Sequence, residues 1–173
     1  VQINSTVTRE TIRTVPAMFE LLRTKRPVKR WSLFNLIPVG RGLMLGSPTA
    51  QQIEELFAWV HDHTKGAPFH VSTVEAPHYR RYHAQQRKQA GASAAPAAPG
   101  VSAIQRHAGI NDGKGLVFVS HTGEIFPSGF LELSAGNVRT TNLAAAYRQS
   151  ELFRVIRDAN RLEGKCGACD YRH

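Results

Sequence analysis

The sequence predicts an α/β protein in two parts, a parallel sheet with helices over residues 1–83 and a small α+β module over 104–173. Strand-like and helix-like segments alternate through the first part, and this alternation is typical of parallel βαβ units with right-handed crossovers. Residues 84–103 are mostly Ala, Pro, Gly, Ser and Gln. Such a composition buries little apolar surface, so this stretch is predicted to be a flexible linker or loop.

The first strand and helix follow from local patterns near the N-terminus. Val1–Thr8 alternates apolar and polar residues and is predicted to form a strand. Thr11 or Thr14 is expected to cap the helix that follows. Trp31–Val39 is a nearly continuous apolar run, which indicates a second strand, buried on both faces of a parallel sheet.

The next segments complete the alternating pattern. The glycines that flank Arg41 predict a loop after the second strand. Ser47-Pro48 is expected to start a helix, with proline at the first helical position, and Gly66 is expected to end it. Phe69–Val74 then has the character of a third short strand.

The last part has different local signals. Gly115–Ser120 and Glu124–Ser128 are separated by a glycine-containing turn, which predicts a β-hairpin. Asn142 and Ser150 are expected to cap two successive helices. Gly164 is expected to close the second of these helices just before the cysteines.

Composition narrows the class of protein. The formal net charge is +9, but the basic residues are scattered, and no basic strand carries interleaved aromatic residues. Nucleic-acid binding is therefore not expected. The basic residues are expected to lie on solvated faces, with an anion-binding surface as the alternative. No apolar run is long enough for a membrane helix. Only two cysteines are present, which favours a reducing compartment such as the cytoplasm.

Cys166 and Cys169 carry the clearest chemical signal. A Cys-x-x-Cys on a glycine-rich turn can direct two thiolates to one metal ion or cluster. Zinc with His173 as a third ligand and a redox pair are the alternatives. Because a thiolate site needs about four ligands, these residues form half a site, and we expect the chain to be a fragment.

Four segments also carry a family resemblance. Gly115–Phe130, Ser134–Arg139, the Tyr147–Phe153 helix junction and Gly164–Arg172 occur in this order. In them the chain resembles radical S-adenosylmethionine (SAM) enzymes with a C-terminal SPASM or twitch domain, in the branch that includes heme-biosynthesis proteins. The run Trp31–Gly42 is similar to a late barrel strand of the same family.

The resemblance implies the C-terminal portion of a partial (βα)6 radical SAM barrel, followed by a truncated SPASM-like module. In that family an electron from a 4Fe-4S cluster cleaves SAM, and the 5′-deoxyadenosyl radical removes a hydrogen atom from the substrate. The family's Cys-x-x-x-Cys-x-x-Cys motif does not occur in this sequence, so this chain alone is expected to be inactive. The implied substrate is a tetrapyrrole, with a peptide as the rival, and ferredoxin or flavodoxin would supply electrons.

The resemblance also assigns roles to residues of the first part. Asn4 and Thr6 would face the SAM ribose or the substrate. Ile37, Pro38 and Val39 would flank the adenine, mainly through their backbone and packing. For each of these residues, a purely structural role in lining a strand end or packing the core is the alternative.

Substrate and metal contacts complete the candidate set. Arg41, His78 and Arg80 follow predicted strand ends and would contact the substrate, with the arginines suited to propionate groups. For Arg41, a solvated loop arginine is the alternative. Cys166 and Cys169 would be ligands of an auxiliary 4Fe-4S cluster. The alternative reading of the whole chain is a non-enzymatic module that binds zinc or an anionic partner.

Overall fold

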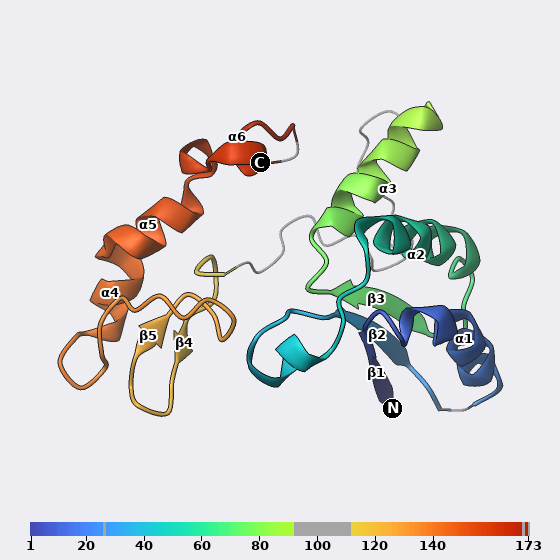
Figure 1. Cartoon of the computed structure of the whole chain (residues 1–173), viewed down its shortest axis with the longest axis horizontal. Coiled ribbons are helices and arrows are strands. Elements are labelled where there is room, and N and C mark those ends of the chain that lie inside the picture. The colour runs from blue at the N-terminus through green and yellow to red at the C-terminus, as the bar shows by residue number, and fades with distance from the viewer. Residues whose placement is uncertain (26, 92–111, 171, 173) are drawn as a thin grey trace. The chain divides into compact units, whose positions relative to one another are not determined.

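A computed structural model of the chain describes residues 1–25, 27–91, 112–170 and 172. The chain divides into two compact units, Val1–Arg106 and His107–His173, and each has its own hydrophobic core. Figure 1 shows the elements of both units. Among the described residues, no helix combines the length and the apolar character that crossing a membrane requires.

The first unit contains a sheet of three parallel strands in the order β1-β2-β3. The strands are β1 (Gln2–Val7), β2 (Arg30–Asn35) and β3 (His70–Val74). Ile3 of β1 is aligned with Trp31 of β2. The parallel pairing predicted from the alternating pattern is therefore confirmed, although every strand is shorter than its predicted range.

Three long helices accompany this sheet (Figure 1). α1 (Val15–Thr24) connects β1 to β2, α2 (Ala50–His63) connects β2 to β3, and α3 (His78–Gln89) follows β3. Sheet and helices share one core, formed by Val7, Val15, Phe19, Leu22, Trp31, Leu33, Leu56, Phe57, Val60, Phe69, Val71, Ala76 and Tyr79. Burial of these aromatic and aliphatic side chains is the main source of stability for the unit.

The central strand β2 is buried on both faces over its first half. Trp31 and Leu33 are fully buried in the core, and Ser32, which points the other way, is also buried. The Ser32 hydroxyl is 3.1 Å from the Ser72 hydroxyl on β3, so the polar group keeps a hydrogen-bond partner. The expectation of a strand buried on both sides is thus confirmed for this stretch.

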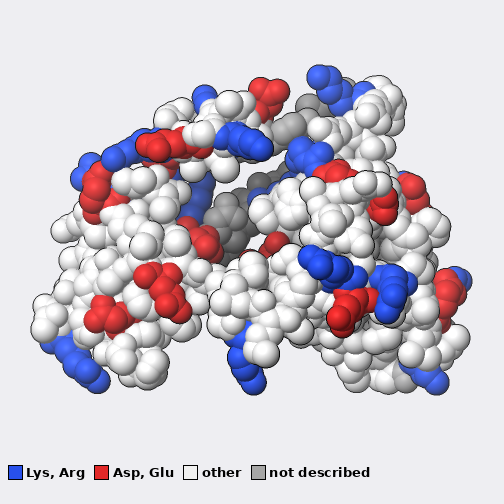
Figure 2. All heavy atoms as spheres, viewed as in Figure 1, with Lys and Arg blue, Asp and Glu red and all other residues white. Residues whose placement is uncertain are grey.

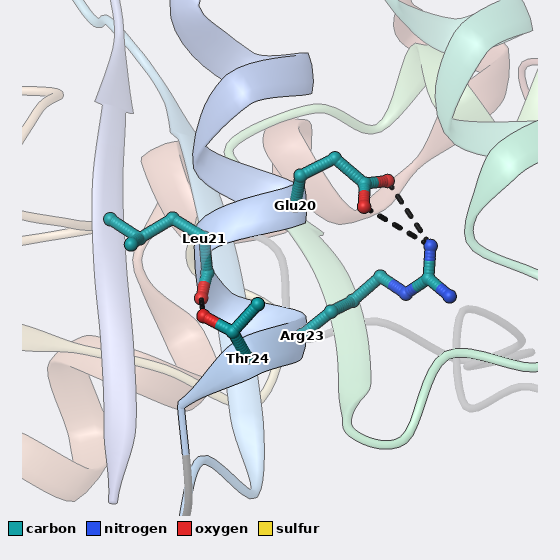
Figure 3. A network of polar contacts seen from close by, with 4 residues as sticks. All are labelled: Glu20, Leu21, Arg23 and Thr24. Carbon is teal, nitrogen blue, oxygen red and sulfur yellow. Dashed lines mark hydrogen bonds and ion pairs between the residues drawn. The ribbon is translucent and has the colours of Figure 1, made fainter.

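The last turn of α1 is held by local polar contacts (Figure 3). Arg23 Nη1 lies 3.2 Å from Glu20 Oε2, and the Thr24 hydroxyl donates to the Leu21 carbonyl at 2.7 Å. At the other end, Thr14 occupies the N-cap position, but its side chain makes no capping hydrogen bond. The ion pair is exposed, so it contributes little to stability.

α2 begins later than predicted, and its cap is Thr49 rather than Ser47. The Gln52 N–H donates to Thr49 Oγ1 at 3.2 Å, and Gln52 Oε1 accepts from the Thr49 N–H at 2.8 Å. This reciprocal capping box satisfies two backbone donors that the Ser47-Pro48 start would have left open.

The linker predicted over residues 84–103 is wrong for its first part, because residues 84–89 belong to α3. Two contacts fix this helix: Tyr79 is 2% exposed in the core, and Arg81 forms an ion pair with Glu54 of α2. Gln, Arg and Lys side chains also favour a helix intrinsically. From residue 92 on, the predicted linker lies outside the described residues.

The second unit joins a short hairpin to two helices. The hairpin consists of β4 (Phe118–Val119) and β5 (Ile125–Phe126), which pair antiparallel. α4 (Leu143–Gln149) and α5 (Glu151–Arg157) follow, capped by the side chains of Asn142 and Ser150. The hairpin and both caps were predicted correctly, while the hairpin strands are shorter than expected.

The core of the second unit is small and centres on Ile125 and Phe153, both fully buried. Arg157 closes one side of it, because its guanidinium lies 4.0 Å from the centre of the Tyr147 ring. Arg157 Nε also donates to the Gly113 carbonyl at 2.8 Å. One side chain therefore ties α5 to the chain that precedes the hairpin.

Charged side chains are mixed over the face drawn in Figure 2. Lys and Arg are spread among Asp and Glu on both units rather than gathered into one patch. The excess of positive charge in the sequence therefore gives no single-sign surface on this face.

Candidate functional site

The carboxyl ends of parallel strands form the edge at which α/β proteins place their sites. Here β1 runs into a turn made of threonine side chains. The Thr11 hydroxyl donates to the Thr6 carbonyl at 2.7 Å and accepts from the Thr8 N–H at 2.8 Å. Thr11, predicted as a possible helix cap, therefore fixes the end of β1 instead.

Asn4 and Thr6 both lie on the exposed side of β1, as predicted from their spacing. Asn4 Oδ1 accepts from Gln2 Nε2 at 2.8 Å. Thr6, but not Asn4, lines an open cleft of about 410 Å³ between β1 and α1, whose walls include Met18 and Leu21. This mostly apolar cleft suits a hydrocarbon group better than ribose hydroxyls.

Ile37, Pro38 and Val39 are not part of a strand, because β2 ends at Asn35. The predicted strand over Trp31–Val39 is therefore too long. The Val39 N–H donates to the Ile37 carbonyl at 2.8 Å, so the chain turns tightly around Pro38. Proline has no N–H for a strand ladder, which explains why the strand stops early.

A short 3-10 helix, η2 (Gly40–Met44), follows this turn, where a loop was predicted. It contains Arg41, whose side chain is exposed. Figure 1 shows the segment extending outward from the carboxyl end of β2. Arg41 is thus near the expected edge of the sheet and available to an anionic ligand.

Two features of this edge were missed by sequence reasoning. Asn35 is aligned with Val7 at the end of the sheet, and its Oδ1 is buried without a hydrogen-bond partner among the described residues. Glu75, directly after β3, has φ of 55°, and no other described non-glycine residue has a positive φ. Orphaned buried acceptors and strained backbone both concentrate at functional sites. The sequence did contain one signal for this edge, namely a polar residue, Asn35, within the apolar run that starts at Trp31.

His78 and Arg80 lie in the first turn of α3. The His78 ring is 4.8 Å from the Phe57 ring of α2, and burial, followed by the nearby Arg81, lowers the pKa of His78. A neutral imidazole is a poor partner for a carboxylate. Arg80 is exposed, so Arg41 and Arg80 are the better candidates for binding carboxylates.

Cys166 and Cys169 lie on one turn at the end of the second unit. Cys166 is in the short helix α6 (Gly164–Gly167), and the Cys169 N–H donates to the Cys166 carbonyl at 3.3 Å. Both side chains are exposed and neither is in a disulfide. Gly164 opens α6 rather than closing α5, which ends at Arg157, so this expectation was wrong.

The cysteine turn fits part of a metal or cluster site. Two exposed thiols on one turn supply about half of a four-ligand thiolate shell. Over residues 1–25, 27–91, 112–170 and 172, no group of three or more His, Cys, Asp or Glu side chains is arranged to hold a metal ion. His173, considered as a third zinc ligand, lies outside the described residues.

Comparison with known proteins finds relatives along almost the whole chain. It is 38% identical over 174 residues to the AdoMet-dependent heme synthase of Oleidesulfovibrio alaskensis, and 39% over 172 residues to that of Nitratidesulfovibrio vulgaris. The protein of the same name from Methanosarcina barkeri is 33% identical over 171 residues. The chain is homologous to AdoMet-dependent heme synthases.

These alignments include 98 to 99% of this chain but only 44 to 48% of each relative. The chain thus spans somewhat less than half the length of the curated relatives it matches. No protein-family profile matches the sequence, and no solved structure matches it. The resemblance to heme-biosynthesis proteins is confirmed by the names of the relatives, whereas the barrel, the SPASM module and the cluster ligands stay predictions.

Proposed function

We propose that this chain forms part of a SAM-dependent heme synthase of the radical type. The supporting observation is the identity of 38 to 39% with two proteins named for that activity, along nearly all of the chain. Three parallel strands in sequential order, joined by helices, are also what consecutive strands of an α/β barrel require. In this proposal the first unit contributes barrel strands and the second unit is a SPASM-like module.

The sheet edge would bind the small molecules. Asn4 and Thr6 present polar groups on the exposed side of β1, and residues 37–39 offer backbone and apolar contacts for the adenine. Arg41 and Arg80 would each hold a propionate of a tetrapyrrole, because a guanidinium binds a carboxylate through two parallel hydrogen bonds. These residues position the ligands and do not themselves react.

The cysteine turn would hold part of an auxiliary 4Fe-4S cluster through Cys166 and Cys169. Arg172 Nη1 donates to the Gly167 carbonyl, which places a positive charge on the same turn. When bound, a cluster of this kind supplies electron transfer.

The test is the iron and sulfide content of the whole protein purified without oxygen. The double substitution Cys166→Ser and Cys169→Ser should remove about four iron atoms per chain, one cluster's worth, and leave SAM cleavage to the other cluster intact. Lys165→Ala is the matched control, since Lys165 is in the same turn and is not a ligand. Equal iron in all three proteins would contradict cluster ligation. Stoichiometric zinc without iron would instead support the non-enzymatic module.

A further inference from the structure

The segment that follows the tight turn after β2 exposes large apolar side chains. In this segment, residues 39–45, here named the apolar turn, Leu43 is 70% exposed, Met44 88% and Leu45 49%. Two internal backbone hydrogen bonds, of 2.9 and 3.1 Å, hold its conformation. An ordered segment that presents several apolar side chains to solvent is typical of a binding surface.

The apolar turn is anchored to the rest of the first unit at both ends. The Arg9 N–H donates to the Gly46 carbonyl at 2.7 Å, and Arg9 Nε donates to the Ser47 carbonyl at 3.4 Å. A Cβ on Gly42 would lie only 2.9 Å from the Ile37 carbonyl oxygen, so the backbone packs closely there. Exposure of the apolar side chains is therefore built into the fold.

Positive charge borders this apolar surface. Arg41 and Met44 are three residues apart in a 3-10 helix, so their side chains project from the same side of η2. Arg9 brings a second guanidinium to the far end of the segment. No Asp or Glu occurs in residues 36–49, so Arg41 is the charged residue of this segment.

We propose that the apolar turn binds a flat, carboxylated porphyrin ring, with Leu43 and Met44 against the macrocycle and Arg41 and Arg9 on its carboxylates. The argument for this occupant is charge complementarity beside an apolar surface, which matches a ring that is apolar on its faces and anionic at its edge. This inference rests on the proposed function and deepens it, because it names the surface that recognises the tetrapyrrole.

The experiment is a binding titration of the 173-residue chain with protoporphyrin IX, which has two propionates, followed by porphyrin fluorescence. The double substitution Leu43→Ser and Met44→Ser should weaken binding at least about tenfold, because two apolar side chains lose their contact. Leu133→Ser, at a residue that is 52% exposed in the second unit, is the matched control and should leave the affinity unchanged. Circular dichroism checks that each variant is folded.

A second titration separates charge from apolar contact. Arg41→Gln should weaken binding of the porphyrin diacid several-fold and leave binding of its dimethyl ester unchanged. Equal affinities for wild type and the Leu43 and Met44 variant would overturn the proposal. The proposal would also be overturned if the Leu43 and Met44 variant abolished self-association, or binding to lipid vesicles, while its porphyrin affinity stayed unchanged.

The proposed cluster site and the porphyrin-binding surface can be refuted independently of each other. Porphyrin binding needs only the first unit, whereas the iron measurement concerns Cys166 and Cys169 in the second. If the cysteine substitutions leave the iron content unchanged but porphyrin still binds, the proposed metal site is overturned and the apolar turn is kept as a tetrapyrrole surface. A cluster with no porphyrin binding would overturn the inference alone.

Discussion

A side-chain hydrogen bond links β1 to β2 in addition to the backbone pairing of the two strands, and its removal gives a measurable test of the sheet. Trp31 is fully buried, and its Nε1 donates to Ser5 Oγ at 2.9 Å. Ser5→Ala would remove the acceptor of the indole N–H of Trp31, a side chain that is fully buried. An unpaired buried donor costs about 1–3 kcal/mol, so we expect a loss of about 2 kcal/mol in the free energy of unfolding.

Urea unfolding followed by tryptophan fluorescence measures this loss. The only tryptophans, Trp31 and Trp59, both lie in the first unit, so the signal reports the unfolding of that unit. With a urea slope of roughly 1–3 kcal/mol per M, a loss of about 2 kcal/mol lowers the midpoint by roughly 1 M.

The control is the same substitution in a Trp31→Phe background. Phenylalanine has no N–H, so Ser5→Ala should cost at least about 1 kcal/mol less there than in the wild type. An equal cost in both backgrounds would show that the Ser5–Trp31 bond does not stabilise the sheet. The stability of the first unit would then rest on the backbone pairing of β1 with β2 and on apolar burial, without a contribution from this side-chain contact.

Two further predictions concern a turn and a titrating side chain. Gly123→Ala should lower the unfolding free energy of the second unit by at least about 1 kcal/mol, because φ is +93° and the new Cβ would lie 2.8 Å from Asn137 Oδ1. The control is Gly129→Ala, since Gly129 has no positive φ and the nearest atom to its new Cβ lies at 3.4 Å. Burial lowers the pKa of His78 below 6.5, so the unfolded chain binds this proton more tightly and stability falls as the pH drops through 6.5. His78→Gln should therefore reduce the loss of urea resistance between about pH 7.5 and about pH 5; identical losses in both proteins would contradict the shift.

Local patterns predicted the elements that depend on local physics. The alternation in Val1–Thr8 and the apolar run from Trp31 gave adjacent parallel strands, and Asn142 and Ser150 gave two correct caps. The predicted start of α2 was wrong because the Ser47-Pro48 signal was given more weight than the Thr49 capping box. Both patterns were present in the sequence, and only the second one closes two backbone hydrogen bonds.

The errors at residues 84–89 and at the sheet edge have a different origin. Composition alone made 84–89 look like a linker, but the Arg81–Glu54 ion pair and burial of Tyr79 hold α3 against α2. Likewise, the orphaned Asn35 oxygen and the strained Glu75 backbone exist only once three strands end side by side. Such features arise from contacts between distant residues, which a single sequence does not reveal.

The candidate chemistry is divided between two structural units, and this division makes the proposals independent of each other. The first unit offers binding groups, namely exposed polar side chains on β1, the apolar turn and arginines at the sheet edge, but no cysteine. The second offers two thiols on one turn, and its described residues include no group of three or more His, Cys, Asp or Glu side chains arranged to hold a metal ion. Since about four ligands complete a cluster, Cys166 and Cys169 need donors from elsewhere, whereas the apolar turn needs none to bind a porphyrin. Ligand binding by the first unit is therefore the part of the proposed function that the isolated chain can test directly.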